Sequence, residues 1–230
     1  MLKAVLFDLD DTLVDQEGAA DAAVVAFAAE HGIHDVEVRR RWSAISAVHY
    51  GRYQRREVTF AEQRRARVRE LLSLDVSDDD ADDLFGGYLR RYEAGWTLFD
   101  DAVPALRRAR SAGLAVVVLT NGDEEQQRRK LRLLGLEDEV STLVASSSLP
   151  AGKPDQRAFR GALARVGVHA SEALMVGDSL EDDVRGALRA GLGAVLVDRT
   201  GDGRAGHGRT NGVRTVSSLD DVTFGDTPRP

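Results

Sequence analysis

The chain has 230 residues, of which 43% are hydrophobic and 30% are charged, a balance typical of a folded globular protein. Its formal net charge of −7 disfavours nucleic acid as a partner, because phosphate backbones bind positively charged surfaces. It has no cysteine, which excludes disulfides, thiolate catalysis and cysteine-ligated zinc. The N-terminus has no signal-peptide pattern, and no window reaches the roughly 18 apolar residues of a membrane span. We therefore expect a cytoplasmic protein with no membrane partner.

The first predicted elements are one strand and a long helical insertion. Residues 4–7 form a continuous apolar run, which predicts a buried strand. About 90 residues then separate this strand from the next pattern that fits a core helix, far more than a loop needs. Helical patterns within this stretch cover residues 19–30, 59–72 and 77–92. Thr59 and Glu62 have the spacing of a capping box.

The remainder alternates between apolar runs and helical patterns. Further apolar runs cover residues 114–119, 142–145, 173–176 and 194–197. Helical patterns cover residues 102–112, 124–134, 156–166 and 182–190. Each helical pattern ends next to a glycine, which the C-terminal end of a helix favours. This alternation predicts an α/β fold with a doubly wound, mainly parallel sheet.

The end of the chain contains few regular patterns. A glycine-rich loop follows Asp198, then a short strand at residues 213–216 and a helical turn at 218–222, and the last five residues have no pattern. We expect residues 1–14 and 96–230 to form the α/β core, and residues 15–95 to form a small helical domain inserted in it.

Two aspartates directly follow the first predicted strand. Asp8 and Asp10 are two positions apart, so in an extended segment their side chains lie on the same face. In open α/β sheets, binding sites form at the carboxyl ends of the strands. The two residues are therefore candidates for chemistry. The alternative is an acidic turn or a helix cap after the strand.

A second acidic cluster follows the predicted strand at 173–176. Gly177 and Asp178 come first, and Asp182 and Asp183 follow. Two unit charges about 4 Å apart repel by about 4 kcal/mol at an effective dielectric constant of about 20. If the fold brings the two clusters together, a cation must offset this repulsion, and all-oxygen ligation favours Mg²⁺ over Zn²⁺. Alternatively, Asp182 and Asp183 are acids in the first turn of a helix.

Two further segments could bind an anion. Thr120, Asn121 and Gly122 close the strand at 114–119 and offer a hydroxyl, an amide and exposed backbone N–H groups. A turn with a helix cap is the alternative there. Lys153 stands out because only three of the 31 basic residues are lysines. Pro154 could open a helix and fix the direction from which the lysine approaches.

In this order, the four segments resemble the motifs of the haloacid dehalogenase-like (HAD) superfamily, and the chain is similar to its phosphatase branch. The resemblance covers residues 1–200, and the insertion resembles the family's type-one cap. The first motif, Asp-x-Asp-x-Thr, matches the segment from Asp8 to Thr12. The other three match Thr120, Lys153-Pro154, and Gly177-Asp178 with Asp182 or Asp183.

The resemblance implies a role for each matching residue. Asp8 would attack phosphorus and form an aspartyl-phosphate, while Asp10 would act as general acid and then as general base. Asp8, Asp178 and the backbone carbonyl of Asp10 would hold Mg²⁺. Thr120, Asn121 and Lys153 would bind the phosphoryl oxygens. Asp183, in preference to Asp182, would support Lys153 or a water on the metal.

The resemblance predicts a phosphatase acting on a small phosphorylated metabolite, as a monomer or homodimer. A phosphomutase shares every core motif, so it stays open. A metal-independent haloacid dehalogenase would need neither Asp10 nor Asp178. A non-catalytic binding module with the same fold is the alternative from another class. Sugar phosphates, nucleoside monophosphates and phosphoglycolate all remain open as substrates.

Overall fold

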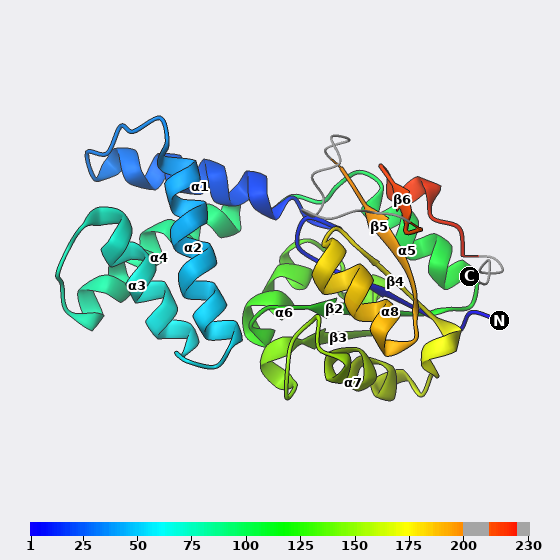
Figure 1. Ribbon diagram of the computed structural model, residues 1–230. Helices are drawn as coiled ribbons and strands as arrows, with labels where there is room; N and C mark the ends of the chain where they lie inside the picture. Colours follow the sequence, from blue (N-terminus) through cyan, green and yellow to red (C-terminus); the bar gives the residue numbers. More distant parts are fainter. Residues whose placement is uncertain (200–211, 225–230) are drawn as a thin grey trace. The chain divides into compact units, whose positions relative to one another are not determined.

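The computed structural model describes residues 1–199 and 212–224, and the chain divides into two compact units (Figure 1). The core unit comprises Met1–Asp15 and Leu98–Pro230, and the helical unit comprises Gln16–Thr97. The sequence predicts residues 15–95 for the helical insertion. Most of the predicted glycine-rich loop after Asp198 and the C-terminal end lie outside the described residues.

The described part of the core unit contains a six-stranded parallel sheet in the order β3-β2-β1-β4-β5-β6. The strands are β1 (Ala4–Phe7), β2 (Ala115–Thr120), β3 (Thr142–Ala145), β4 (Ala173–Gly177), β5 (Gly193–Val197) and β6 (Arg214–Val216). The predicted doubly wound α/β fold is confirmed. Five continuous apolar runs became strands because a sheet covered on both faces buries every side chain along them.

Helices connect the strands in the positions that the sequence predicts. They are α5 (Ala102–Ser111), α6 (Glu124–Leu133), α7 (Gln156–Val166) and α8 (Gly186–Ala190), with short 3₁₀ turns at Glu137–Glu139, Ser146–Ser148, Ala170–Glu172 and Leu219–Asp221. The predicted regular helix at 182–190 is wrong in its first half. There the chain forms a π-helical turn, η4 (Leu180–Arg185), because Ser179 caps it and its carbonyl accepts from the N–H of Val184, five residues on.

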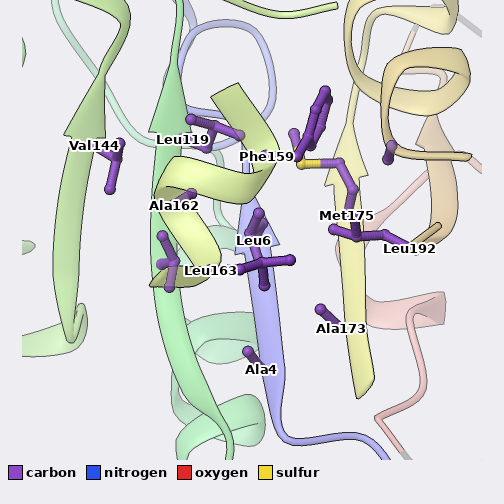
Figure 2. Packing of buried hydrophobic residues seen from close by; sticks show 12 residues of the cluster. Ala4, Leu6, Leu119, Val144, Phe159, Ala162, Leu163, Ala173, Met175 and Leu192 are labelled. Atoms are coloured by element: carbon purple, nitrogen blue, oxygen red, sulfur yellow. The ribbon is translucent and has the colours of Figure 1, made fainter. Parts of the chain in front are cut away.

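The sheet and helix α7 share an apolar core (Figure 2). Alternate strand residues point to the same face, so Leu6, Leu119 and Met175 gather there, against Phe159 and Leu163 of α7. Phe159 and Leu6 are completely buried. Burying one such side chain contributes about 1.5–3 kcal/mol. This packing fixes the strands whose carboxyl ends carry the acidic residues.

The helical unit consists of α1 (Gln16–Glu30), α2 (Val38–Gln54), α3 (Phe60–Leu72) and α4 (Asp78–Ala94). Helix α2 was not predicted, because its sequence is mostly polar and arginine-rich. Its buried residues Val38, Trp42 and Ile45 nevertheless lie on one face at helical spacing. Trp42 packs with Phe85 and Tyr88 of α4 in the apolar centre of this unit.

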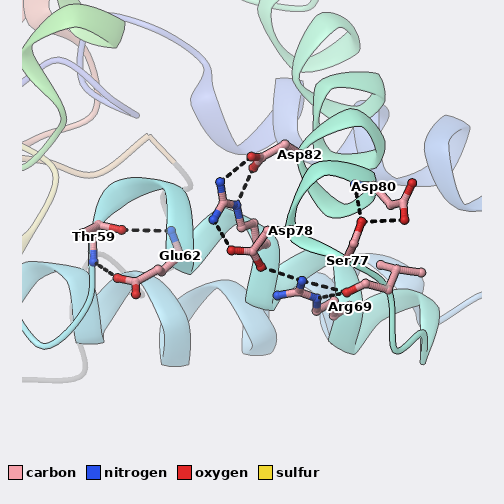
Figure 3. Close-up of polar contacts among 9 residues, drawn as sticks. Thr59, Glu62, Arg69, Ser77, Asp78, Asp80 and Asp82 are labelled. Carbon is pink, nitrogen blue, oxygen red and sulfur yellow. Dashed lines mark hydrogen bonds and ion pairs between the residues drawn. The ribbon is translucent and has the colours of Figure 1, made fainter.

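Side chains cap the N-terminal ends of helices α3 and α4 (Figure 3). The predicted capping box is confirmed: the Thr59 hydroxyl accepts from the N–H of Glu62, and the Glu62 carboxylate accepts from the N–H of Thr59. Ser77 caps α4 through the N–H of Asp80. These bonds satisfy backbone N–H groups that have no partner within a helix.

Candidate active site

The strand order places the acidic residues at one point of the sheet. Strands β1 and β4 are neighbours, with Phe7 opposite Val176, although 169 positions separate these two residues in the chain. The strand order reverses beside β1, and such a switch point is where doubly wound sheets bind ligands. Asp8 follows β1 and Asp178 follows β4, so the two predicted clusters meet there.

Lys153 lies between two carboxylates in the interior of the core unit. Its Nζ donates to Oδ1 of Asp8 at 2.5 Å and to Oδ1 of Asp183 at 2.6 Å. The lysine and both aspartates are buried. Burial by itself disfavours the charged lysine, but Asp183 and Asp8 outweigh it and raise the pKa of Lys153. Lys153 is therefore a fixed positive charge beside Asp8.

Three carboxylates converge around this lysine. Asp8, Asp178 and Asp183 each place one carboxylate oxygen within 4.8 Å of the others. Burial, reinforced by Asp183 and Asp178, raises the pKa of Asp8 well above its ordinary value, although Lys153 opposes the shift. Burial and then Asp183 raise the pKa of Asp178 to about 6. Lys153 can neutralise only one of the three charges, so the cluster requires a further cation when it is fully ionised.

The donor set fits Mg²⁺. Every side-chain donor in the cluster is a carboxylate oxygen, which hard cations prefer. Asp8 and Asp178 belong to the predicted metal site, whereas Asp183 is a predicted supporting residue that places a carboxylate oxygen within 4.8 Å of both. The third predicted ligand is the backbone carbonyl of Asp10, and it stays a prediction.

Asp183, rather than Asp182, contacts Lys153. Its Oδ1 accepts from Lys153, and its Oδ2 accepts from the N–H of Ser179 at 3.0 Å. Asp182 is half-buried, and burial followed by the charge of Asp183 raises its pKa. Gly177 allows this arrangement, because a Cβ there would lie 2.2 Å from Oδ2 of Asp183. The geometry therefore supports Asp183 as the second acid of the fourth motif.

Asn121 orients Lys153 in this structure. Its Oδ1 accepts from the N–H of Lys153 and its Nδ2 donates to the carbonyl of Lys153, both at 2.7 Å. Gly152 must be small here, since a Cβ would lie 2.5 Å from Oδ1 of Asn121. The sequence predicts Asn121 as a phosphate ligand. These two bonds hold the segment that carries Lys153, and the role of Asn121 as a phosphate ligand stays a prediction.

Thr120 and Asp10 share a partner that sequence reasoning missed. Nε2 of Gln127 donates to Oδ2 of Asp10 at 2.8 Å and to Oγ1 of Thr120 at 3.1 Å. Lys130 forms an ion pair with Oδ1 of Asp10. The scarcity of lysine was a usable signal for Lys130, as it was for Lys153. For Gln127 the sequence offered no signal.

Thr12 makes a further side-chain contact that the sequence did not predict. Its Oγ1 donates to Oδ1 of Asp178 at 3.0 Å, and its side chain is completely buried. The first motif thus joins the fourth through a hydroxyl as well as through the carboxylates. Thr12 stands in the turn after β1, where Asp11 has a φ of 60° and the N–H of Asp11 bonds the carbonyl of Val14 at 2.7 Å.

A doubly wound sheet with an acidic cluster at its switch point is typical of α/β enzymes that bind their ligand there. The haloacid dehalogenase-like hydrolase family model matches residues 2–191. The chain therefore belongs to the haloacid dehalogenase-like hydrolases. Within the described residues, none of the helices has the length and apolar character to cross a membrane.

Two curated relatives are phosphatases. The chain is 35% identical to the ribulose-1,5-bisphosphate 5-phosphatase of Halopiger xanaduensis over 211 residues, which cover 86% of this chain and 85% of that protein. It is 47% identical to the phosphoserine phosphatase of Thermus thermophilus over 110 residues. The latter match covers 48% of this chain and 43% of the relative, so it spans less than half of either protein.

Two solved structures are similar over 95% of the chain. The HAD-hydrolase YfnB from Bacillus subtilis, bound to magnesium, has a TM-score of 0.78, 24% identity and 96% of its own chain covered, which shows the fold alone. The 2-haloacid dehalogenase from Pseudomonas syringae has a TM-score of 0.68, 28% identity and 95% coverage of its own chain. The relatives thus include both phosphatases and a dehalogenase.

Proposed function

We propose that this protein is a Mg²⁺-dependent phosphatase that hydrolyses a small phosphorylated metabolite with Asp8 as the nucleophile. The observation that carries the proposal is the position of Asp8. It is buried, its Oδ1 accepts from Lys153 at 2.5 Å, and carboxylate oxygens of Asp178 and Asp183 lie within 4.8 Å. A buried carboxylate beside a fixed ammonium and a candidate cation site is suited to attack on a phosphate ester.

In the first step, an oxygen of Asp8 forms a bond to phosphorus while the bond from phosphorus to the leaving oxygen breaks. Asp10 donates a proton to that oxygen, which leaves as an alcohol. Lys153 and residues 120–122, called the Thr120 segment below, bind the remaining phosphoryl oxygens as negative charge spreads onto them. Asn121 keeps Lys153 in place through its backbone.

In the second step, Asp10 takes a proton from water, the water oxygen bonds to phosphorus, and the Asp8–phosphorus bond breaks. Phosphate leaves and both aspartates return to their initial state. Mg²⁺, held by Asp8 and Asp178 with Asp183 close by, would offset the negative charge of the cluster and of the phosphoryl group. Thr12 orients Asp178 through its hydroxyl.

The second candidate is hydrolytic dehalogenation, which the similarity to a solved dehalogenase raises. The side chains around Asp8 favour phosphoryl transfer. The half-buried Asp178 and the buried Asp183 add two carboxylates that a carbon–halogen displacement does not use, and Asp10 supplies an acid that a halide leaving group does not need. The named activities of the phosphatase relatives favour the same choice.

The test is a panel of phosphorylated metabolites assayed with Mg²⁺ and with EDTA. We expect turnover with Mg²⁺ that EDTA abolishes, and a loss of at least about 10³-fold in kcat for Asp8→Asn, since the nucleophile is removed. Asp138→Asn is the matched control, because Asp138 is an exposed aspartate of the same unit, and it should retain full activity. Turnover that survives in Asp8→Asn or in EDTA would contradict the mechanism. Halide release from a haloacid would favour the second candidate.

A further inference from the structure

We propose that Lys130 and Gln127 of helix α6 form a clamp that positions Asp10 for proton transfer. The inference rests on the proposed function, in which Asp10 is the general acid and base. Lys130 binds Oδ1 of Asp10, and Gln127 donates to Oδ2 at 2.8 Å. Both oxygens of the catalytic carboxylate are thus held from a single helix.

The position of α6 makes the clamp possible. Gln127 and Lys130 are three residues apart, so they project from the same face of the helix. The helix begins directly after the Thr120 segment, with Asp123 as its cap through the N–H of Gln126 at 3.1 Å. A Cβ at Gly122 would lie 2.4 Å from Nε2 of Gln127. The glycine after Asn121 is therefore needed for Gln127 to reach Asp10.

The two partners of the ion pair differ in how far their side chains are exposed to solvent. The side chain of Lys130 is 1% exposed, whereas that of Asp10 is 27% exposed. The lysine supports the carboxylate from inside the core unit, and the carboxylate remains accessible on its other side. A group that delivers a proton to a bound substrate needs this arrangement, in which its orientation is fixed and its surface is open.

The stability of the fold does not by itself explain why a lysine occupies position 130. Removing an ammonium group from water costs several kcal/mol, and a buried ion pair often stabilises a fold no better than apolar residues of the same size. A leucine or methionine would fill the space beneath Asp10 at less cost. The chain nevertheless places one of its three lysines there. A positioning role explains why a charge is retained at this point.

Loss of the clamp should impair proton donation more than phosphate binding. A poor leaving group needs a proton in the transition state, whereas a good one leaves with little assistance. General acid catalysis contributes about 10²–10⁴-fold, and part of this is lost when the acid is misplaced. Lys130→Met should therefore slow poor leaving groups selectively.

The experiment measures kcat and KM of wild type and Lys130→Met on a series of aryl phosphates and on an alkyl phosphate, with Mg²⁺. We expect kcat to fall about 10- to 100-fold for the alkyl ester and less than about 3-fold for p-nitrophenyl phosphate, with KM unchanged. In an Asp10→Asn background, Lys130→Met should cause no further loss. Lys3→Met is the matched control, since Lys3 is an exposed lysine of the same unit, paired with Glu172.

Gln127→Leu is the second variant if Lys130→Met does not fold, and it should show the same selectivity for poor leaving groups. Equal losses on all esters, or a further loss in the Asp10→Asn background, would overturn the clamp while leaving the phosphatase proposal intact. Absence of wild-type turnover on every ester, or full activity of Asp8→Asn, would overturn the proposed function, and the clamp with it.

Discussion

Charge balance governs the candidate site at the scale of single residues. The buried Asp8 and Asp183 and the half-buried Asp178 share one lysine, Lys153, which bonds Asp8 and Asp183 directly. Burial, and after it the mutual repulsion of the carboxylates, raises the pKa of Asp8 and of Asp178, so protons or a metal ion must offset the negative charge of the cluster. The charges of this cluster therefore matter for the proposed reaction, and they also destabilise the folded state when all three carboxylates are ionised.

Gly177→Ala is a test of this crowding. A Cβ would lie 2.2 Å from Oδ2 of Asp183, so the carboxylate would have to leave its bonds to Lys153 and to the N–H of Ser179. We expect a loss of about 2–4 kcal/mol in the free energy of unfolding and a large fall in kcat. Urea unfolding and steady-state kinetics measure both.

Gly86→Ala is the control for the glycine substitution. A Cβ there would meet only the far end of Arg90, at 3.6 Å, within helix α4. An alanine in a helix interior should leave stability unchanged or raise it by up to about 1 kcal/mol. Equal losses in the two variants would show that Asp183 is not the cause.

At the scale of elements, the residues that cap the N-terminal ends of helices have different roles in the two units. In the core unit, Asp123 and Ser179 begin α6 and η4 where site residues emerge. In the helical unit, Thr59 and Ser77 begin α3 and α4, and Asp78 and Asp82 of α4 pair with arginines of α3 (Figure 3). These exposed ion pairs contribute little each, so the caps matter more for local stability.

Thr59→Ala tests the capping box. Losing the hydroxyl leaves the N–H of Glu62 without its partner, and such a substitution costs about 1 kcal/mol. We expect a lower midpoint of thermal unfolding, measured by circular dichroism. Thr59→Ser keeps the hydroxyl and should retain most of the stability. If both variants lost the same amount, the methyl group rather than the cap would be responsible.

At the scale of the whole molecule, stability should depend on pH and Mg²⁺ together. The folded-state pKa of Asp178 is about 6, above its ordinary value of 3.8. Between these values the folded protein binds more protons than the unfolded chain. The stabilising contribution of Asp178 is therefore complete below about pH 4 and is lost as the pH rises through 6, by about 3 kcal/mol at most.

Mg²⁺ should reverse this loss, because it binds the deprotonated carboxylates. We expect Mg²⁺ at 100 times its dissociation constant to add about 2.7 kcal/mol at pH 8, and much less at pH 5. Urea unfolding with Mg²⁺ and with EDTA across this pH range measures the effect. In Asp178→Asn both the pH dependence and the Mg²⁺ effect should shrink. An equal Mg²⁺ effect at pH 5 and pH 8 would contradict the assignment.

Local patterns in the chain are sufficient to predict the strands, most helices and the acidic strand ends. Continuous apolar runs are typical of strands in a parallel sheet, because helices bury both of its faces. Each run ends where a polar segment begins, as at Asp8 and Asp178. Helix α2 escaped prediction because only Val38, Trp42 and Ile45 mark its buried face among many polar residues. The many polar residues of this segment made the helical spacing of its three buried residues hard to recognise in the sequence.

Contacts between distant segments depend on the tertiary structure alone. Lys130 lies 120 residues from Asp10 and meets it because β1 and β2 are neighbours and α6 follows β2. Asp183 rather than Asp182 reaches Lys153 because a π-helical turn begins at Leu180. Short-range spacing records which residue types follow a strand, but strand order and helix phase determine which of them touch.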